Sequence, residues 1–121
     1  MSRGGDALAI VRAYHEAWTA GSCDTAGRYL AEDLVVEVPI NSYPTRASFV
    51  AALTAFAPLV KHVTVLSSLG GTGEVMLLYD MEVKQLGRLR VAEHFSVADG
   101  QIHRLRQVHD TVAVRAAGFG P

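Results

Sequence analysis

The first part of the chain carries apolar residues at helical spacing. Between Asp6 and Ala20 they recur every three or four positions, which is typical of a helix with one buried face. The residues of this face are Leu8, Val11, Tyr14, His15 and Trp18. Gly21 follows directly and ends the predicted helix, because glycine favours the conformation that terminates helices.

Two further helices and one strand are predicted before residue 60. Ser22 can cap a short helix that ends at Glu32-Asp33, and residues 34–38 are rich in β-branched side chains up to Pro39. Thr45 can cap a third helix, which ends before Pro58. The residues expected to face inward are Ala26, Tyr29 and Leu30 on the second helix, and Phe49, Val50, Leu53 and Phe56 on the third.

The second half of the chain is rich in β-forming residues. Four strands are predicted at 62–68, 75–83, 89–97 and 101–110, separated by glycine-rich or polar turns. Helices followed by hairpin-linked strands indicate an α+β fold, with helices on one face of a curved antiparallel sheet. We expect one domain over residues 1–121, with a core at about 6–110 and an Ala- and Gly-rich tail at 111–121 that is at best partly ordered.

Strand alternation indicates which side chains face the helices. On the fourth strand one face carries Val91, Glu93, Phe95 and Val97, whereas the other carries Ala92, His94 and Ser96. The first face is more apolar, so Glu93 is predicted to lie inside. The alternative is that Glu93 pairs with Arg90 or Arg106 across the sheet.

The position of Asp80 depends on the length of the turn at Lys84–Gly87. A two- or four-residue turn would place Asp80 beside Glu93, and two adjacent carboxyl groups in an apolar cavity would raise one pKa. A turn of odd length would place Tyr79 and Met81 on that face instead.

The last strand places Gln107 and His109 on one face with His103 and Leu105. We expect Gln107 and His109 to face the pocket. His109 is a candidate base, since the unperturbed histidine pKa lies near neutrality. Tyr14 and Trp18 lie one helical turn apart and can line the same wall.

Composition excludes several classes of function. The net charge is -1 and both signs are interspersed, so no basic stripe is available for nucleic acid. The single cysteine, Cys23, and the lack of a signal or membrane-spanning run favour a cytoplasmic protein that binds no membrane. No histidine spacing indicates a metal site and no glycine motif indicates a nucleotide, so no metal or cofactor is expected.

Three segments in order carry a resemblance to a known superfamily. They are Tyr14–Gly21, Tyr29–Asp33 followed by a strand ending at Pro39, and Ala98–Ile102 within the hairpin region. This series resembles the SnoaL-like polyketide cyclases and the ketosteroid isomerases of the nuclear transport factor 2-like superfamily. The resemblance implies a cone-shaped, cystatin-like α+β fold, a homodimer, and a pocket for a small, mostly apolar molecule.

The resemblance can be followed residue by residue. Tyr14 matches the oxyanion-hole tyrosine of the ketosteroid isomerases, and Glu93 falls where that family has a neutral carboxylic acid. Val38 stands where the family has its aspartate base. The Asp-Arg-Asp set of the superfamily's epoxide hydrolases is also incomplete, because Leu78 and Gln107 stand at two of its positions beside Asp80.

The sequence supports two hypotheses of function. The first is a cofactor-independent isomerase, cyclase or dehydratase acting on a small apolar carbonyl compound. In it Asp80 or His109 is the base, and Tyr14 with protonated Glu93 holds the oxyanion. The residues expected to bind ligand are Trp18, Val38, Phe56, Phe95 and Gln107. The second hypothesis is a non-catalytic ligand-binding domain, favoured by Val38.

Overall fold

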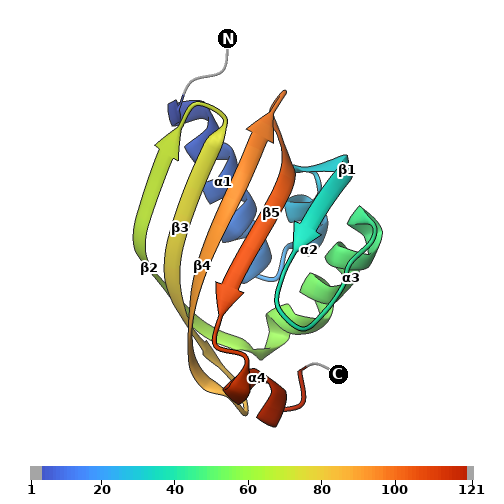
Figure 1. The fold of residues 1–121 in the computed structure, drawn as a ribbon, viewed down its shortest axis with the longest axis vertical. Helices are drawn as coiled ribbons and strands as arrows, with labels where there is room; N and C mark the ends of the chain where they lie inside the picture. Colours follow the sequence, from blue (N-terminus) through green and yellow to red (C-terminus); the bar gives the residue numbers. More distant parts are fainter. Residues whose placement is uncertain (1–3, 120–121) are drawn as a thin grey trace.

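The structure, a computed structural model, describes residues 4–119 (Figure 1). Three helices and one strand come first: α1 (Gly4–Thr19), α2 (Cys23–Gly27), β1 (Leu30–Glu37) and α3 (Arg46–Phe56). A single 3₁₀ turn, η1 (Ala57–Leu59), leads into β2 (Val60–Gly71), β3 (Glu74–Val83), β4 (Gly87–Ala98) and β5 (Gln101–His109). A short helix, α4 (Val112–Ala116), follows the last strand. The predicted α+β fold is confirmed.

The five strands form one sheet in the order β1-β5-β4-β3-β2. Strands β2 to β5 make the predicted antiparallel meander, whereas β1 joins the sheet edge in parallel with β5. A parallel neighbour requires a long connection, and here α3 and strands β2 to β4 lie between β1 and β5 along the chain. The expected antiparallel sheet therefore has one parallel edge.

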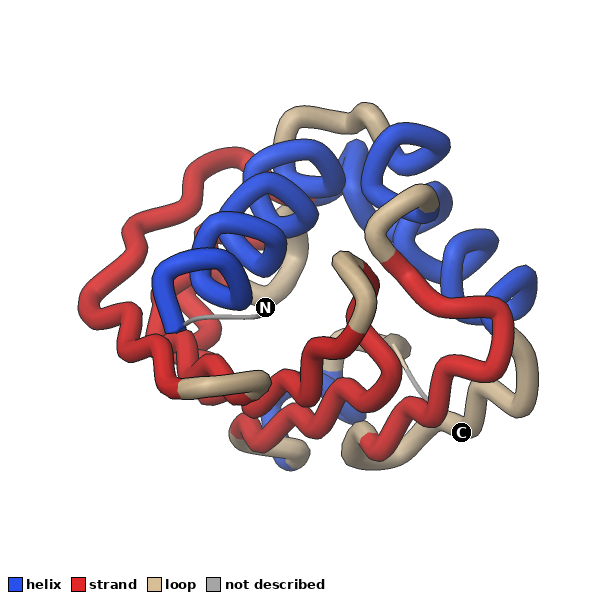
Figure 2. Tube along the Cα trace, turned by 90° about the horizontal axis from the view of Figure 1, so that it is seen from above, coloured by secondary structure: helices blue, strands red, loops and turns tan. Residues whose placement is uncertain are grey.

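Helices α1 and α3 cover one face of the curved sheet, which Figure 2 shows from above. The apolar stripe of α1 is buried, with Val11, Tyr14 and Trp18 each at most 3% exposed. Thr45 caps α3 as predicted, because its side chain accepts from Ser48 N at 3.0 Å. None of the helices in residues 4–119 is long and apolar enough to cross a membrane.

The region after Gly27 is strand rather than helix. We expected helical structure as far as Glu32-Asp33, but β1 begins at Leu30. Ile102 N donates to Tyr29 O at 2.7 Å, so pairing with β5 satisfies backbone groups that a longer α2 would have bonded internally. Leu30 is still fully buried, as predicted.

The turn between β3 and β4 has three residues, which corrects the prediction for Asp80. Val83 pairs with Gly87, and both Gln85 (φ 71°) and Gly87 (φ 85°) adopt the left-handed conformation that such a turn requires. The odd length places Tyr79 and Met81 on the inner face with Glu93. Asp80 lies on the outer face, where Arg90 Nε donates to it at 2.7 Å.

Candidate functional site

A cavity of about 400 Å³ lies between the sheet and α3. Its lining residues come from α1, α3, β3, β4, β5, α4 and the loop after β1, and none of those described is Asp, Glu, Lys or Arg. Most of the wall is aliphatic or aromatic. A cavity of this size without charge favours a small, uncharged and mostly apolar ligand.

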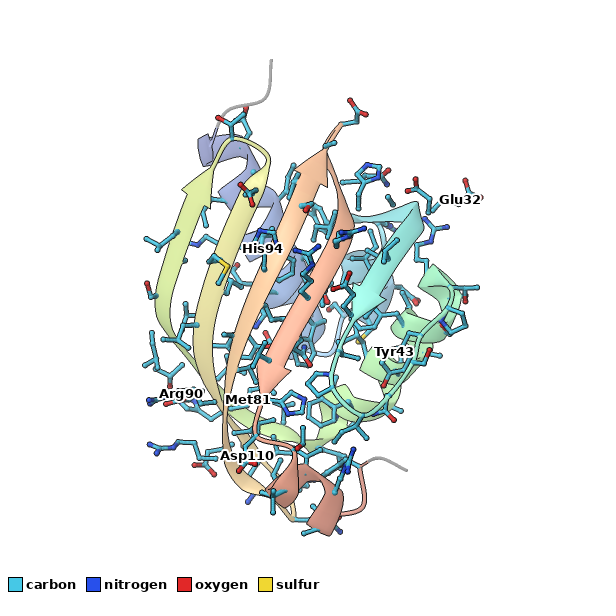
Figure 3. The ribbon with its side chains drawn as sticks, in the orientation of Figure 1. Glu32, Tyr43, Met81, Arg90, His94 and Asp110 are labelled. Atoms are coloured by element: carbon cyan, nitrogen blue, oxygen red, sulfur yellow. The ribbon has the colours of Figure 1, made fainter. Side chains whose placement is uncertain are left out.

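The C-terminal segment closes part of this cavity. Val114 of α4 and Phe119 are lining residues, and the Phe119 ring lies 5.8 Å from the Phe56 ring. Asn41 Nδ2 donates to Phe119 O at 3.3 Å. We expected a partly ordered tail, whereas the structure places residues up to 119 against the ligand space. Figure 3 shows Tyr43 on the loop beside this region.

A buried carboxyl group stands behind the polar part of the wall. Glu93 is 2% exposed, Tyr79 OH donates to its Oε1 at 2.7 Å, and Gln107 Nε2 donates to its Oε2 at 3.0 Å. We call Tyr79, Glu93 and Gln107 the Glu93 cluster. Gln107 is its half-buried member and lines the cavity, so it lies between the carboxyl group and the ligand space.

Burial changes the protonation of this cluster. Desolvation raises the pKa of Glu93 to about 7, although the hydrogen bonds from Tyr79 and Gln107 pull in the opposite direction. Desolvation and the charge of Glu93 also raise the pKa of Tyr79 and Tyr14 well above the usual tyrosine value. Both tyrosines therefore stay neutral, and the cluster exchanges its proton near neutral pH at Glu93.

His109 presents a free nitrogen on the same strand face as Gln107. Its Nδ1 lies 2.9 Å from Asp110 O, and a carbonyl oxygen can only accept, so Nδ1 carries the proton. In the neutral ring Nε2 is then an unprotonated acceptor. Residues two apart on a strand are about 7 Å apart, which leaves room for a small ligand to contact both side chains.

His15 is a buried histidine that the sequence did not single out for chemistry. It is 3% exposed, its ring centroid lies 4.4 Å from that of Tyr79, and its Nε2 has no partner within the described residues. Desolvation lowers the pKa of His15 to about 4. His15 is therefore neutral at physiological pH and supports the Tyr79 ring.

Most residues predicted to bind ligand line the cavity. These are Trp18, Val38, Phe56 and Gln107, together with the predicted base His109. Tyr14 and Phe95 do not line it; their rings contact each other at 6.0 Å in the core. Asp80 faces away from the cavity, as described above. The ion pair considered for Glu93 is absent, since both of its oxygens bond within the cluster.

From the sequence, Phe119 had no role in the site, and Tyr79 was placed on the inner face only for a turn of odd length. The turn length was therefore the missing signal for Tyr79. No group of three or more potential metal ligands occurs within the part of the chain that the structure describes.

Trp18 is expected to report ligand binding. It is the chain's one tryptophan, lines the cavity and lies 6.2 Å from Phe56. A ligand in the cavity changes the environment of the indole ring, so emission should shift or quench on titration. Free tryptophan amide titrated with the same ligand corrects for absorption. Unchanged emission with a ligand whose binding is proven by calorimetry would show that Trp18 does not sense the cavity.

Comparisons with known proteins agree on the family. Residues 11–105 match the SnoaL-like domain family, and no curated protein matches the chain. A crystal structure of a protein from Kribbella flavida DSM 17836 is 33% identical, with a TM-score of 0.85, and the match covers 91% of each chain.

Two similar structures have named activities. An LEH-like epoxide hydrolase of M. tuberculosis is 21% identical, with a TM-score of 0.76 and coverage of 94% of this chain and 90% of that one. A steroid delta-isomerase from Pseudomonas aeruginosa is 17% identical, with a TM-score of 0.76 and coverage of 93% and 86%. At these identities the two show a shared fold, which does not by itself fix an activity.

Proposed function

This chain belongs to the SnoaL-like domain family of the nuclear transport factor 2-like superfamily, and we propose that it is a cofactor-independent acid–base enzyme. Its substrate is a small, uncharged, mostly apolar carbonyl compound, and the reaction is an isomerisation, cyclisation or dehydration. Each of these reactions begins with a proton moved next to a carbonyl group. The residues that could move it lie on one face of β5.

One observation carries the proposal. His109 and Gln107 lie two positions apart on the wall of an uncharged cavity. His109 Nε2 is an acceptor nitrogen, and the amide of Gln107 is bonded to the buried carboxyl group of Glu93. Removing a proton beside a carbonyl needs a base for the proton and a donor for the oxygen that becomes negative. His109 supplies the first. Gln107 supplies the second when its amide NH₂, which bonds to Glu93 in the structure, turns to face the cavity.

The corrected roles differ from those expected for the ketosteroid isomerases. Of the two candidate bases, His109 is the one we propose, because Asp80 lies on the outer face of the sheet. Tyr14 is replaced by Gln107 at the oxyanion, because Tyr14 does not line the cavity. Glu93 keeps a supporting role behind Gln107, and burial among uncharged groups keeps it protonated up to about pH 7.

Proton abstraction can be tested before the natural substrate is known. The protein is incubated in deuterium oxide with β-tetralone, an uncharged enolisable ketone, and loss of its α-proton signal is followed by NMR. We expect exchange faster than in buffer or with heat-denatured protein. Ketones that bind by calorimetry but exchange at the buffer rate would refute the proposed enzyme.

That refutation would favour the second function, a passive ligand-binding domain. The specific observation in its favour is Val38, which lines the cavity where a carboxylate base is expected for a ketosteroid isomerase. A structure of the protein with its co-purified ligand would then show an apolar molecule with no polar group near His109 Nε2.

We further propose a cytoplasmic homodimer formed through the outer face of the sheet. Cys23 is free and buried, which suits a reducing compartment. The outer face carries exposed apolar side chains beside ion pairs such as Asp80–Arg90, and Leu69, Met76 and Val108 are 44–68% exposed. Figure 3 shows His94 on this same face, turned away from α1.

Light scattering should therefore give twice the chain mass of 13.0 kDa. Val108→Asp places a charge on the proposed interface and should yield a monomer, because an unpaired buried charge is costly. Val112→Asp is the matched control, since Val112 is 76% exposed but lies on α4. A monomeric mass for the unaltered protein at tens of micromolar would contradict the dimer.

A further inference from the structure

We propose that Glu93 sets the hydrogen-bond polarity of the cavity by fixing which end of the Gln107 amide faces the ligand. With Glu93 ionised the cavity selects an apolar molecule that donates through O–H or N–H. With Glu93 protonated it selects a carbonyl compound. This inference rests on the proposed function, because it assumes that the ligand occupies the same cavity.

The inference begins with the two ends of the Gln107 side chain. A primary amide has an NH₂ group that donates and an oxygen that accepts, and the two leave the amide carbon in different directions. Gln107 Nε2 donates to Glu93 Oε2 at 3.0 Å. Gln107 is half-buried and lines the cavity, so its other end, Oε1, is the end available to a ligand.

An ionised Glu93 holds this orientation. A carboxylate can only accept, so it takes the NH₂ of Gln107 and repels the amide oxygen. Tyr79 OH already donates to the other carboxylate oxygen at 2.7 Å. Gln107 Oε1 is thereby held toward the cavity. His109 Nε2 is a second acceptor on the same strand face, so the polar wall offers acceptors to the ligand.

A protonated Glu93 reverses the orientation. Because Tyr79 occupies Oε1 as a donor, the acid proton belongs on Oε2, which faces Gln107. An O–H there needs an acceptor, and rotation of the amide by half a turn supplies Gln107 Oε1. The NH₂ group then points into the cavity. The wall gains a donor suited to a carbonyl oxygen.

The surroundings of Glu93 leave no other charged group to control this change. The titratable groups that interact with it among the described residues are Tyr79 on β3 and Tyr14 on α1. Its cross-strand neighbours are Leu77 and Gln107. Both tyrosines have pKa values raised by burial and stay neutral, whereas burial raises the pKa of Glu93 to about 7. The change of polarity therefore falls near neutral pH.

A matched pair of probes tests the inference by calorimetry. β-Naphthol donates through its hydroxyl group, and β-acetonaphthone accepts through its carbonyl group on the same ring system. From about pH 5.5 to about pH 8.5 the preference for the naphthol over the ketone should rise roughly tenfold, which is the effect of one hydrogen bond made or left unmade.

Three variants assign the change to its source. Glu93→Gln cannot ionise, so its preference should not vary with pH and should stay on the ketone side. His109→Gln retains the Glu93 cluster and should keep most of the variation. Gln107→Leu lacks the reorienting amide and should lose it, which provides a second test if Glu93→Gln fails to fold.

The outcomes separate this inference from the proposed function. If both probes bind and their ratio is constant with pH in the unaltered protein, the polarity change is refuted, and the exchange of β-tetralone decides separately whether the proposed enzyme stands. The same holds if the variation disappears in His109→Gln but persists in Glu93→Gln. If neither probe binds at any pH, the cavity is not a site for such ligands and both proposals fail.

Discussion

Replacing His109 with glutamine should slow α-proton exchange from bound ketones by roughly 10²–10⁴-fold, the usual contribution of a positioned general base. Glutamine keeps the size and polarity of the side chain but has no basic nitrogen. The measurement is the exchange of β-tetralone in deuterium oxide, and calorimetry of the same ketone checks that binding persists. A large loss of exchange with little loss of affinity would place His109 at the reacting atoms.

A second histidine on β5 provides the control. His103 does not line the cavity; its ring bonds with Asp33 and with Ala98 O. His103→Gln is the same substitution on the same strand and should leave exchange within about twofold, as is usual for surface changes. Exchange that survives in His109→Gln would refute His109 as the base.

The pH dependence of exchange has a definite sign on the alkaline side. The donor for the oxyanion needs protonated Glu93, and that proton is lost as pH rises through about 7. Exchange should therefore decline above that pH. In Glu93→Gln this decline should be absent, because the side chain cannot ionise.

The residues facing the cavity were partly predictable because strand alternation fixes a face. Glu93 was placed correctly on the inner face from its apolar neighbours, and Gln107 and His109 from the charged residues on the opposite face of their strand. Alternation does not give depth, however. Phe95 shares the face of Glu93 but lies where β4 passes behind Tyr14, beyond the end of the cavity.

Two other features depend on tertiary structure that local sequence does not encode. The residues Lys84–Gly87 suit turns of several lengths, and only pairing of Val83 with Gly87 selects three residues and so moves Asp80 outside. The C-terminal segment has the composition of a loose tail. Its order comes from Val114 and Phe119 packing on a cavity wall built by residues far away in the chain.

Stability should show two opposing pH dependences from buried groups. Glu93 is protonated in the folded state up to about pH 7, whereas the unfolded chain releases that proton near its ordinary value of 4.5. Folding stability is therefore lost as pH rises between these values. His15 behaves in the opposite way: its pKa falls from 6.5 to about 4, so the unfolded chain binds a proton that the folded one excludes, and stability is lost as pH falls.

The two effects overlap between pH 4.5 and 6.5. In the unaltered protein the loss of stability from Glu93 and the gain from His15 as pH rises should cancel in this range. Each single variant removes one of them. Glu93→Gln should become more stable relative to the unaltered protein as pH rises through this range, by about 3 kcal/mol in total, because roughly 1.4 kcal/mol accompanies each pKa unit. Near neutral pH its stability should match or exceed that of the unaltered protein.

His15→Phe tests the contribution of His15, whose pH dependence of stability has the opposite sign. Phenylalanine preserves the ring contacts with Tyr79 and Trp18 but cannot take a proton, so the variant should gain about 3 kcal/mol relative to the unaltered protein as pH falls from 6.5 to about 4. Urea unfolding at a series of pH values measures both variants, with His103→Gln as a partly exposed histidine control. Parallel pH profiles for all four proteins would mean that neither buried group has the shifted pKa. If the stability of Glu93→Gln and that of His15→Phe, each relative to the unaltered protein, change with pH in opposite directions, the folded protein retains a proton on Glu93 and excludes one from His15.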